Sequence, residues 1–375
     1  MNPIINKILR LRSENRFNVN TENSNRHCIQ TTEEDGTTTA YYFGTPIYDS
    51  ESERLLSMRF TNISGVAKMR GSNADITISD KIILKNNNGY CSVSLRDKPV
   101  EINEDFVAFG IDCAIPTTNG IAYIARTNTR YQFIVEANAP IVSIKTNDKS
   151  FSFMRTEYCP FATISMIGSL NSERTIIAPA VMDYQELGNG KFRITIYACD
   201  PTAKYVMFEV NLYEPKLFQD TTVESKHPNE NNAFGGTAFV GNTKQFGEQW
   251  LYTRLNYSII PELLNKNITH AILHIPQHNN SASPLKAHTV SARFCSFGSN
   301  WENKIPEEKL AISSFDNTDT KSFDITRFIL DANTNRLLHS EGMIIKTDKS
   351  NKTFNAISTG DCYFAPQILE IHYDQ

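Results

Sequence analysis

One segment of the chain alternates side chains that could bind a ligand with side chains that suit a core. Every second residue is aromatic or polar: Trp250, Tyr252, Arg254 and Asn256. The intervening residues are Leu251, Thr253 and Leu255. Because successive side chains of a strand point to opposite faces, one face of this strand is predicted to be polar and aromatic. An aromatic platform with an arginine fork, which matches a carboxylate, is the arrangement needed to bind a sugar or a polyanion.

A structural alternative exists for the same face. The aliphatic stem of Arg254 could cover core surface while Trp250 packs at a sheet edge. The second tryptophan, Trp301, follows Gly298-Ser299-Asn300 and begins a loop. A lone tryptophan at a strand end most often belongs to the core, so we interpret Trp301 as a core residue.

Four histidines between residues 270 and 288 have side chains that can bind a metal ion: His270, His274, His278 and His288. On a helix, His270 and His274 would share one face, but the segment has the pattern of a strand. On a strand these two side chains lie about 13 Å apart, too far to share one metal ion. We therefore expect no zinc site.

Four side chains between residues 313 and 324 could supply oxygen ligands: Asp316, Asn317, Asp319 and Asp324. Hard cations such as calcium prefer such oxygens. The segment lacks the glycine and terminal glutamate of an EF-hand, and asparagine and aspartate also favour turns by bonding their own backbone. The segment is thus compatible either with a calcium site or with an ordinary turn. We expect no other cofactor.

The sequence contains no nucleophile elbow, His-Glu-x-x-His, P-loop or dinucleotide fingerprint. The two catalytic carboxylates of a glycosidase have no fixed spacing in sequence, so acidic residues of this chain could form such a pair. They are Glu101, Glu104, Asp105, Glu302, Glu307 and Glu308. We interpret them as exposed solubilising charges and expect a non-enzyme, with a polysaccharide lyase or glycoside hydrolase as the competing hypothesis.

Composition excludes several classes of protein. Of the 375 residues 40% are hydrophobic and 21% charged, which is too apolar for a disordered chain. A net charge of −4 gives no global attraction to nucleic acid. No apolar stretch is long enough for a transmembrane helix.

The N-terminal dozen residues, MNPIINKILRLR, favour one short amphipathic helix, because Lys7 and Arg10 interrupt any signal-peptide core. The seven cysteines are scattered singly, without a C-x-x-C pair. Both features indicate synthesis in a reducing cytoplasm without a cleavable signal peptide, whatever the final location.

Strand-like segments bounded by turn residues predict an all-β fold. Hairpins are predicted around residues 86–89, Asn147-Asp148 and Asp200-Pro201. Short helical patterns occur at residues 258–264 and 324–330, where Asp324 could cap the first turn. Strands without intervening helices favour tandem antiparallel β-sandwiches.

Three regions are predicted along the chain. Residues 1–36 form a helix and a polar arm, which reads as a linker or extended segment. Residues 37–215 hold about a dozen candidate strands, enough for one large sandwich or two small ones. A boundary is expected near Pro215, and residues 216–375 form the last domain.

The last region resembles the DNRLRE-type domain, a β-sandwich related to carbohydrate-binding modules of bacterial surface and secreted proteins. Seven segments follow in the family's order: residues 220–242, 250–261, 268–276, 290–301, 322–329, 340–346 and 366–373. They include WLYTRLNYSIIP, ITHAILHIP, SFDITRFI and PQILEIHY. The family's acidic position after the arginine strand is Asn256 here, and ENKIPEEKLAISSF replaces its threonine-rich segment. Residues 36–49 faintly resemble the segment preceding such domains.

The resemblance implies a jelly-roll-like sandwich and acidic-polysaccharide binding. It also implies that Lys244 and Lys346 lie on strands near the Arg254 face, which makes Lys244, Tyr252, Arg254 and Lys346 the candidate ligand-binding residues. We expect a non-catalytic protein of a bacterial surface, phage, spore or appendage that acts by self-assembly or by binding.

Overall fold

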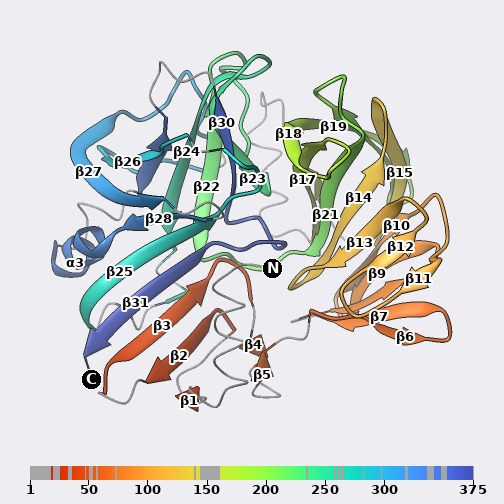
Figure 1. Cartoon of the computed structure of the whole chain (residues 1–375), viewed down its shortest axis with the longest axis horizontal. Coiled ribbons are helices and arrows are strands. Elements are labelled where there is room, and N and C mark those ends of the chain that lie inside the picture. Colours follow the sequence, from red (N-terminus) through yellow and green to blue (C-terminus); the bar gives the residue numbers. More distant parts are fainter. Residues whose placement is uncertain are drawn as a thin grey trace. The chain divides into compact units, whose positions relative to one another are not determined.

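The protein is described by a computed structural model, drawn in Figure 1. The structure describes residues 18–19, 26–32, 36–46, 48–49, 54–55, 58–71, 74–138, 141–143, 161–233, 235–256, 259–260, 263, 266–281, 283–296, 298–316, 320–335, 342–347 and 353–374. Strands make up 58% of the structure, and the remainder is mainly turns and loops. The predicted all-β fold with several antiparallel sheets is therefore confirmed.

The chain divides into two compact units. One contains residues 1–55, 215–233 and 238–375, and we call it the C-terminal sandwich. The other contains residues 56–214 and 234–237, and we call it the central sandwich. A boundary thus falls at Pro215, where the strand pattern changes in the sequence.

The first layer of the C-terminal sandwich is an antiparallel sheet. In spatial order its strands are β1 (Asn18–Val19), β2 (Cys28–Thr32), β3 (Thr38–Phe43), β31 (Ile368–Asp374), β25 (Asn267–Pro276), β28 (Thr320–Asp324) and β27 (Glu307–Asp316). A separate small pair is formed by β4 (Tyr48–Asp49) and β5 (Arg54–Leu55). Strands from both ends of the sequence therefore share one sheet.

The second layer continues from β27. Its strands are β26 (Lys286–Val290), β29 (Met343–Lys346), β24 (Gly247–Leu255), β23 (Thr237–Thr243), β30 (Phe354–Ser358) and β22 (Phe218–Glu224), which pairs with β24. The first part of β27 pairs with β26, and its last four residues, 313–316, pair with β28. A single strand thus links the two layers.

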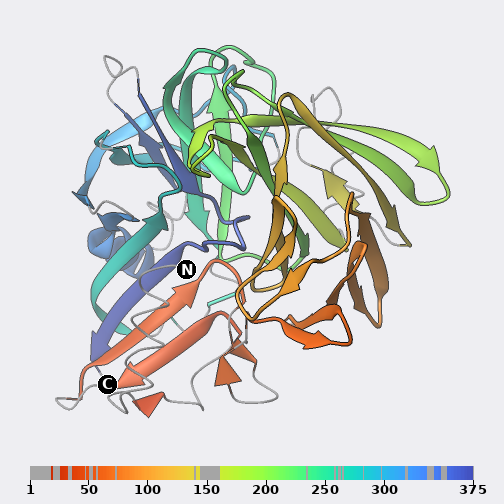
Figure 2. The ribbon, with the colours of Figure 1, turned by 45° about the vertical axis from the view of Figure 1, so that its right-hand side comes forward.

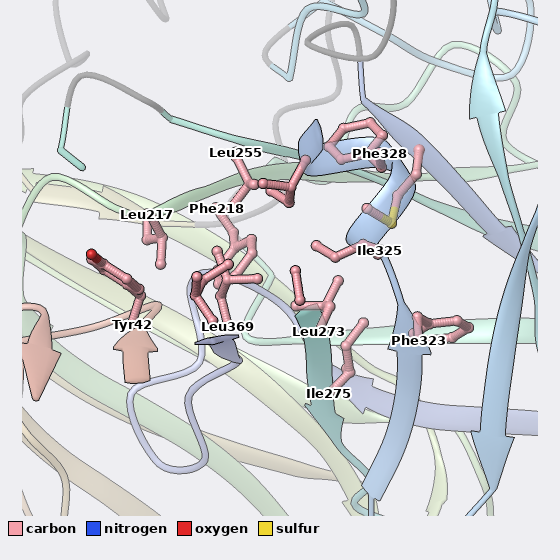
Figure 3. Close-up of a cluster of buried hydrophobic side chains, with 14 of the residues drawn as sticks. Tyr42, Leu217, Phe218, Leu255, Leu273, Ile275, Phe323, Ile325, Phe328 and Leu369 are labelled. Carbon is pink, nitrogen blue, oxygen red and sulfur yellow. The ribbon is translucent and has the colours of Figure 1, made fainter. Parts of the chain in front are cut away.

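Apolar side chains from both layers fill the space between them (Figure 3). Leu273 of β25, Leu369 of β31 and Phe323 of β28 come from the first layer, and Phe218 and Leu255 come from the second. Burying such side chains is the main favourable term in folding. The alternation in the sequence of β24 and β25 therefore follows from a strand with one face in this core.

The helix α3 (Thr326–Asn335) closes one side of the core with Phe328 and Ile329. Asp324 accepts hydrogen bonds from Thr326 N at 3.0 Å and Thr326 Oγ1 at 2.6 Å. The predicted capping role of Asp324 is confirmed.

The central sandwich has two sheets of its own. The first runs β19 (Ala180–Gly188), β20 (Lys191–Ala198), β15 (Arg130–Ala137), β10 (Gly89–Ser94), β9 (Lys81–Asn86), β8 (Asp75–Ile78), β7 (Val66–Arg70) and β6 (Thr61–Ile63). The second runs β11 (Glu101–Ile102), β12 (Val107–Phe109), β13 (Asp112–Pro116), β14 (Gly120–Arg126), β21 (Tyr205–Leu212), β17 (Ala162–Leu170) and β16 (Ile141–Ser143), with β18 (Ile176–Ala178) on β17. The β16–β17 pair is parallel.

Aromatic rings join these two sheets. Phe133 of β15 stacks on Phe208 of β21 with centroids 4.8 Å apart, and Tyr131 of β15 lies 6.0 Å from Tyr123 of β14. All four side chains are buried. Because the rings come from both sheets, this unit is one large sandwich and not two small ones.

The hairpin predictions have three different outcomes. The hairpin at residues 86–89 is confirmed, since Gly89 pairs with Asn86, although none of its turn residues has a positive φ. The hairpin at Asp200-Pro201 is wrong: β20 and β21 lie in different sheets, so this turn carries the chain across the sandwich. The turn at residues 147–148 lies outside the described residues.

The observed units also assign the N-terminal part of the chain differently from the predicted regions. The segment predicted as an arm contains β2, which pairs with β3, and β3 pairs with β31. Residues 37–55 thus lie with the C-terminal sandwich and not with the central unit. The predicted N-terminal helix, residues 1–12, lies outside the described residues.

Candidate ligand-binding site

The two tryptophans of the chain lie against each other. Trp250 comes from β24, and Trp301 comes from the segment between β26 and β27. Their ring centroids are 4.7 Å apart and their planes meet at 50°. Both rings are half-buried, and Trp250 Nε1 donates a hydrogen bond to Glu248 Oε1 at 3.0 Å, which fixes the ring. The pair forms one partly exposed aromatic surface.

Two lysines flank this aromatic surface. Lys304 Nζ lies 4.4 Å from the Trp301 centroid and 5.9 Å from that of Trp250, and Lys346 Nζ lies 5.6 Å from the Trp250 centroid. These distances are within the range of a cation–π interaction. We call Trp250, Trp301, Lys304 and Lys346 the Trp250 cluster.

A carboxylate, an imidazole and a further lysine lie beside the Trp250 cluster. Lys346 forms an ion pair with Glu307, and His288 Nε2 lies 3.9 Å from Glu307 Oε2. The hydrogen bond from Lys346 lowers the pKa of Glu307, which is therefore ionised at neutral pH. Lys286 stands directly opposite Lys346 in the β26–β29 pair. Like charges at such positions repel each other, and the nearby Glu307 carboxylate offsets this repulsion.

Tyr252 lies in the core and not on the surface. Its side chain is buried, and its hydroxyl donates to the Ile305 carbonyl at 2.6 Å. The ring packs in a small apolar cluster with Val223, Val290, Phe294 and Ile344. Burial raises the pKa of Tyr252. The segment between β26 and β27 thus covers the strand face that the sequence predicted to be open.

Arg254 and Lys244 lie apart from each other. Arg254 is half-buried, with its guanidinium carbon 5.9 Å from the Phe294 centroid, as in the structural alternative. Lys244 is exposed in the connection between β23 and β24. From Gly247 to Arg254 the strand extends about 23 Å, at roughly 3.3 Å per residue. Of the four candidate residues, only Lys346 belongs to the Trp250 cluster.

Sequence reasoning missed Lys304. The interpretation of Trp301 as a core residue holds in part, because its half-buried side chain packs against the apolar cluster around Tyr252. The only local signal was the Trp301-x-x-Lys304 spacing, which a turn can bring together. Lys304 Nζ indeed donates to the Trp301 carbonyl at 3.1 Å. That spacing carries no information about Trp250, so the cluster could not be recognised before the fold was known.

The histidines of β25 take part in a hydrogen-bond network. His274 Nε2 donates to Glu370 Oε2 at 3.0 Å, and His372 Nε2 donates to Glu370 Oε1 at 2.7 Å. Burial alone would raise the pKa of Glu370, but these hydrogen bonds outweigh it and lower the pKa to about 2. His270 Nδ1 instead bonds Thr326 Oγ1 at 3.1 Å. His270 and His274 thus have separate partners.

The predicted calcium segment is described only in part. Residues 317–319 and the side chain of Asp316 lie outside the described residues. Asp324 uses its carboxylate to cap α3. Calcium at this segment therefore stays a prediction.

A second set of possible ligands was not foreseen. Single atoms of Glu224, His227 and Glu230 lie within 4.8 Å of one another. Glu224 is buried, and His227 Nδ1 donates to it at 3.2 Å while Gln249 Nε2 donates at 3.4 Å. These hydrogen bonds satisfy the buried carboxylate without a metal ion.

No protein-family model matches this chain, and no curated protein matches it. Within the described ranges, no helix is long and apolar enough to cross a membrane. The DNRLRE-type resemblance therefore remains a prediction from the sequence.

Proposed function

We propose that the C-terminal sandwich is a non-catalytic binding module for an acidic polysaccharide, with the Trp250 cluster as its contact surface. The observation that supports this most is the placement of two lysine ammonium groups around a partly exposed tryptophan pair. A protein of a bacterial, phage or spore surface would use such a module to attach to a glycan layer, as the resemblance to surface-protein domains also suggests.

The chemistry of an acidic sugar fits the groups present. The apolar face of a pyranose ring packs on indole rings, which bury a large area at little entropic cost. A sugar carboxylate accepts charge-assisted hydrogen bonds from lysine, which are about twice as strong as neutral ones. Lys346 and Lys286 on neighbouring strands supply a second cationic position for the next residue of a polymer.

Binding should be tested with a polyuronate, such as polygalacturonate, and with neutral dextran as the comparison polymer. We expect the full chain to bind the polyuronate, more weakly at high salt, and to leave dextran unbound. Lys304→Gln and Lys346→Gln should each lower the affinity about tenfold, since a hydrogen bond to a charged group contributes roughly 1.5–3 kcal/mol.

Lys244→Gln is the matched control, because Lys244 is an exposed lysine of the same unit outside the Trp250 cluster. Its affinity should equal that of the parent chain. Equal losses in all three variants would indicate only a diffuse charge effect and would contradict the proposed site. Absence of polyuronate binding by the parent chain would refute the proposal.

A further inference from the structure

Among the described residues, no strand pairs with one edge of β19. It ends the eight-stranded sheet of the central sandwich and pairs only with β20 (Figure 2). Its first residues contact the body of the unit, but Asp183–Gly188 is exposed along its whole length. An edge of this kind presents backbone N–H and C=O groups that can pair with another strand.

Exposed apolar side chains gather on this hairpin. Tyr184 is 47% exposed, Leu187 42% and Tyr197 36%. They make up half of the large apolar side chains that are exposed among the described residues; the others are Ile63, Val100 and Ile111. No proline protects the edge, and its charges are confined to Asp183 and Glu186. The β19–β20 hairpin thus has exposed apolar side chains next to a strand edge whose backbone groups can pair with another strand.

The sequence of β19 is complementary to itself in one antiparallel register. If Tyr184 lies opposite the partner subunit's Tyr184, then Val181 faces the partner subunit's Leu187, which lies at the bulge between Glu186 and Gly188. In the same register Asp183 faces the partner subunit's Gln185. Aromatic and aliphatic cross-strand pairs of this kind each stabilise a sheet by about 0.2–1 kcal/mol. No like charges meet directly in this register.

Charge complementarity supports the same register. On β20, Arg193 stands opposite Gln185 and donates to its Oε1 at 2.9 Å. Gln185 would lie between Arg193 and the partner subunit's Asp183 on one face. Two strand spacings separate them, about 10 Å between Cα atoms, which an arginine side chain spans. Because of the two-fold symmetry, the dimer would contain this ion pair twice.

We propose that β19 is a self-association edge, through which two copies of the chain pair antiparallel about a two-fold axis at Tyr184. The sheet that runs from β19 to β6 in one copy then becomes continuous with the same sheet of the second copy. Both copies use the same edge, that of β19, in this two-fold contact, so the contact closes at a dimer and does not propagate into a fibre.

Sedimentation equilibrium of the full chain tests the dimer. We expect a concentration-dependent species of twice the chain mass of 42.4 kDa. Tyr184→Glu places two carboxylates opposite each other at the axis and should give a monomer. Tyr197→Glu alters a tyrosine of similar exposure one strand inward and should leave the dimer intact. A parent chain that is monomeric at all concentrations, or a dimer unaffected by Tyr184→Glu, would overturn the proposal.

A cysteine at the axis tests the register itself. Directly opposite Cα atoms of an antiparallel pair lie about 4.5–5.5 Å apart, within the range that a disulfide requires. Tyr184→Cys should therefore form an intermolecular disulfide under mild oxidation, seen on a non-reducing gel, whereas Tyr197→Cys should not. Cross-linking of both variants alike would show collisions only and would refute this register.

Reversal of the charges gives a third readout. Asp183→Arg should weaken the dimer because the new cation meets the partner subunit's Arg193. Adding Arg193→Asp to the same chain restores opposite charges and should restore dimerisation. If the double variant dissociates as easily as Asp183→Arg alone, the proposed ion pair is absent.

Discussion

Trp301 packs on Trp250 with a centroid separation of 4.7 Å, although one belongs to a loop and the other to the central strand of a layer. This contact couples the segment between β26 and β27 to the face of β24. The contact helps to hold the segment between β26 and β27 against β24. It also leaves both tryptophan side chains partly exposed to a ligand.

Trp301→Ala should destabilise the C-terminal sandwich as well as weaken polyuronate binding. The variant loses an aromatic pair, worth about 0.5–1.5 kcal/mol beyond its buried area, and the cation–π contact of Lys304. We expect a loss of about 2 kcal/mol in the free energy of unfolding, measured by urea denaturation. Trp301→Phe keeps a ring and should lose less. An unchanged unfolding free energy in Trp301→Ala would show that the contact contributes nothing.

Tyr252→Phe should lower stability without any effect on polysaccharide binding. The change deletes the hydroxyl that donates to the Ile305 carbonyl at 2.6 Å and leaves that carbonyl without this bond. Loss of one such hydrogen bond costs about 1 kcal/mol. Tyr197→Phe, at an exposed position, is the control and should stay within about 0.5 kcal/mol of the parent chain. If Tyr252→Phe instead lost ligand affinity and kept its stability, Tyr252 would belong to the binding site.

Arg254→Ala should act on stability, because the arginine packs against Phe294 and its Cβ lies beside Gly342. Truncation removes the aliphatic stem from this contact and is expected to cost about 1–2 kcal/mol, read from thermal and urea unfolding. Arg254→Met retains most of the stem and should recover much of the loss. Weaker polyuronate binding at full stability would instead indicate direct contact of Arg254 with the ligand.

The Glu370 network should make stability depend on pH in the acid range. Its pKa falls from an ordinary 4.5 to about 2 in the folded chain, so the unfolded state binds the proton more readily. The stabilisation is fully present above about pH 5 and is lost as the pH falls toward 2. Its upper limit is about 3 kcal/mol, since one pKa unit corresponds to about 1.4 kcal/mol.

Glu370→Gln removes the titrating group and should remove this dependence. Urea unfolding at neutral pH should show the variant less stable than the parent chain, with the difference shrinking steadily between pH 5 and pH 2. Glu104→Gln, at an exposed ion pair with Arg59, is the control and should alter neither value by more than about 0.5 kcal/mol. A difference between Glu370→Gln and the parent that is constant with pH would contradict the assigned shift.

Several features follow from the sequence because they depend on neighbouring residues. The alternation of residues 250–256 predicts a strand with one apolar face, and Leu251 and Leu255 do enter the main core. The Asn-rich turn at residues 86–89 predicts the β9–β10 hairpin, and Asp324 predicts the start of α3. Turn chemistry, capping and strand alternation act over a few residues, so they can be read from the chain itself.

Other features were decided only by the tertiary structure. The sequence could not show that β20 and β21 belong to different sheets, or that β3 would pair with β31 near the opposite end of the chain. It could not show that Phe294 and Ile305 would cover Tyr252, or that Lys304 would join Trp250. Strand partners and covered faces depend on the packing of segments distant in sequence. The sequence by itself determined the strands and their apolar faces, whereas long-range packing decided which polar and aromatic side chains stayed accessible.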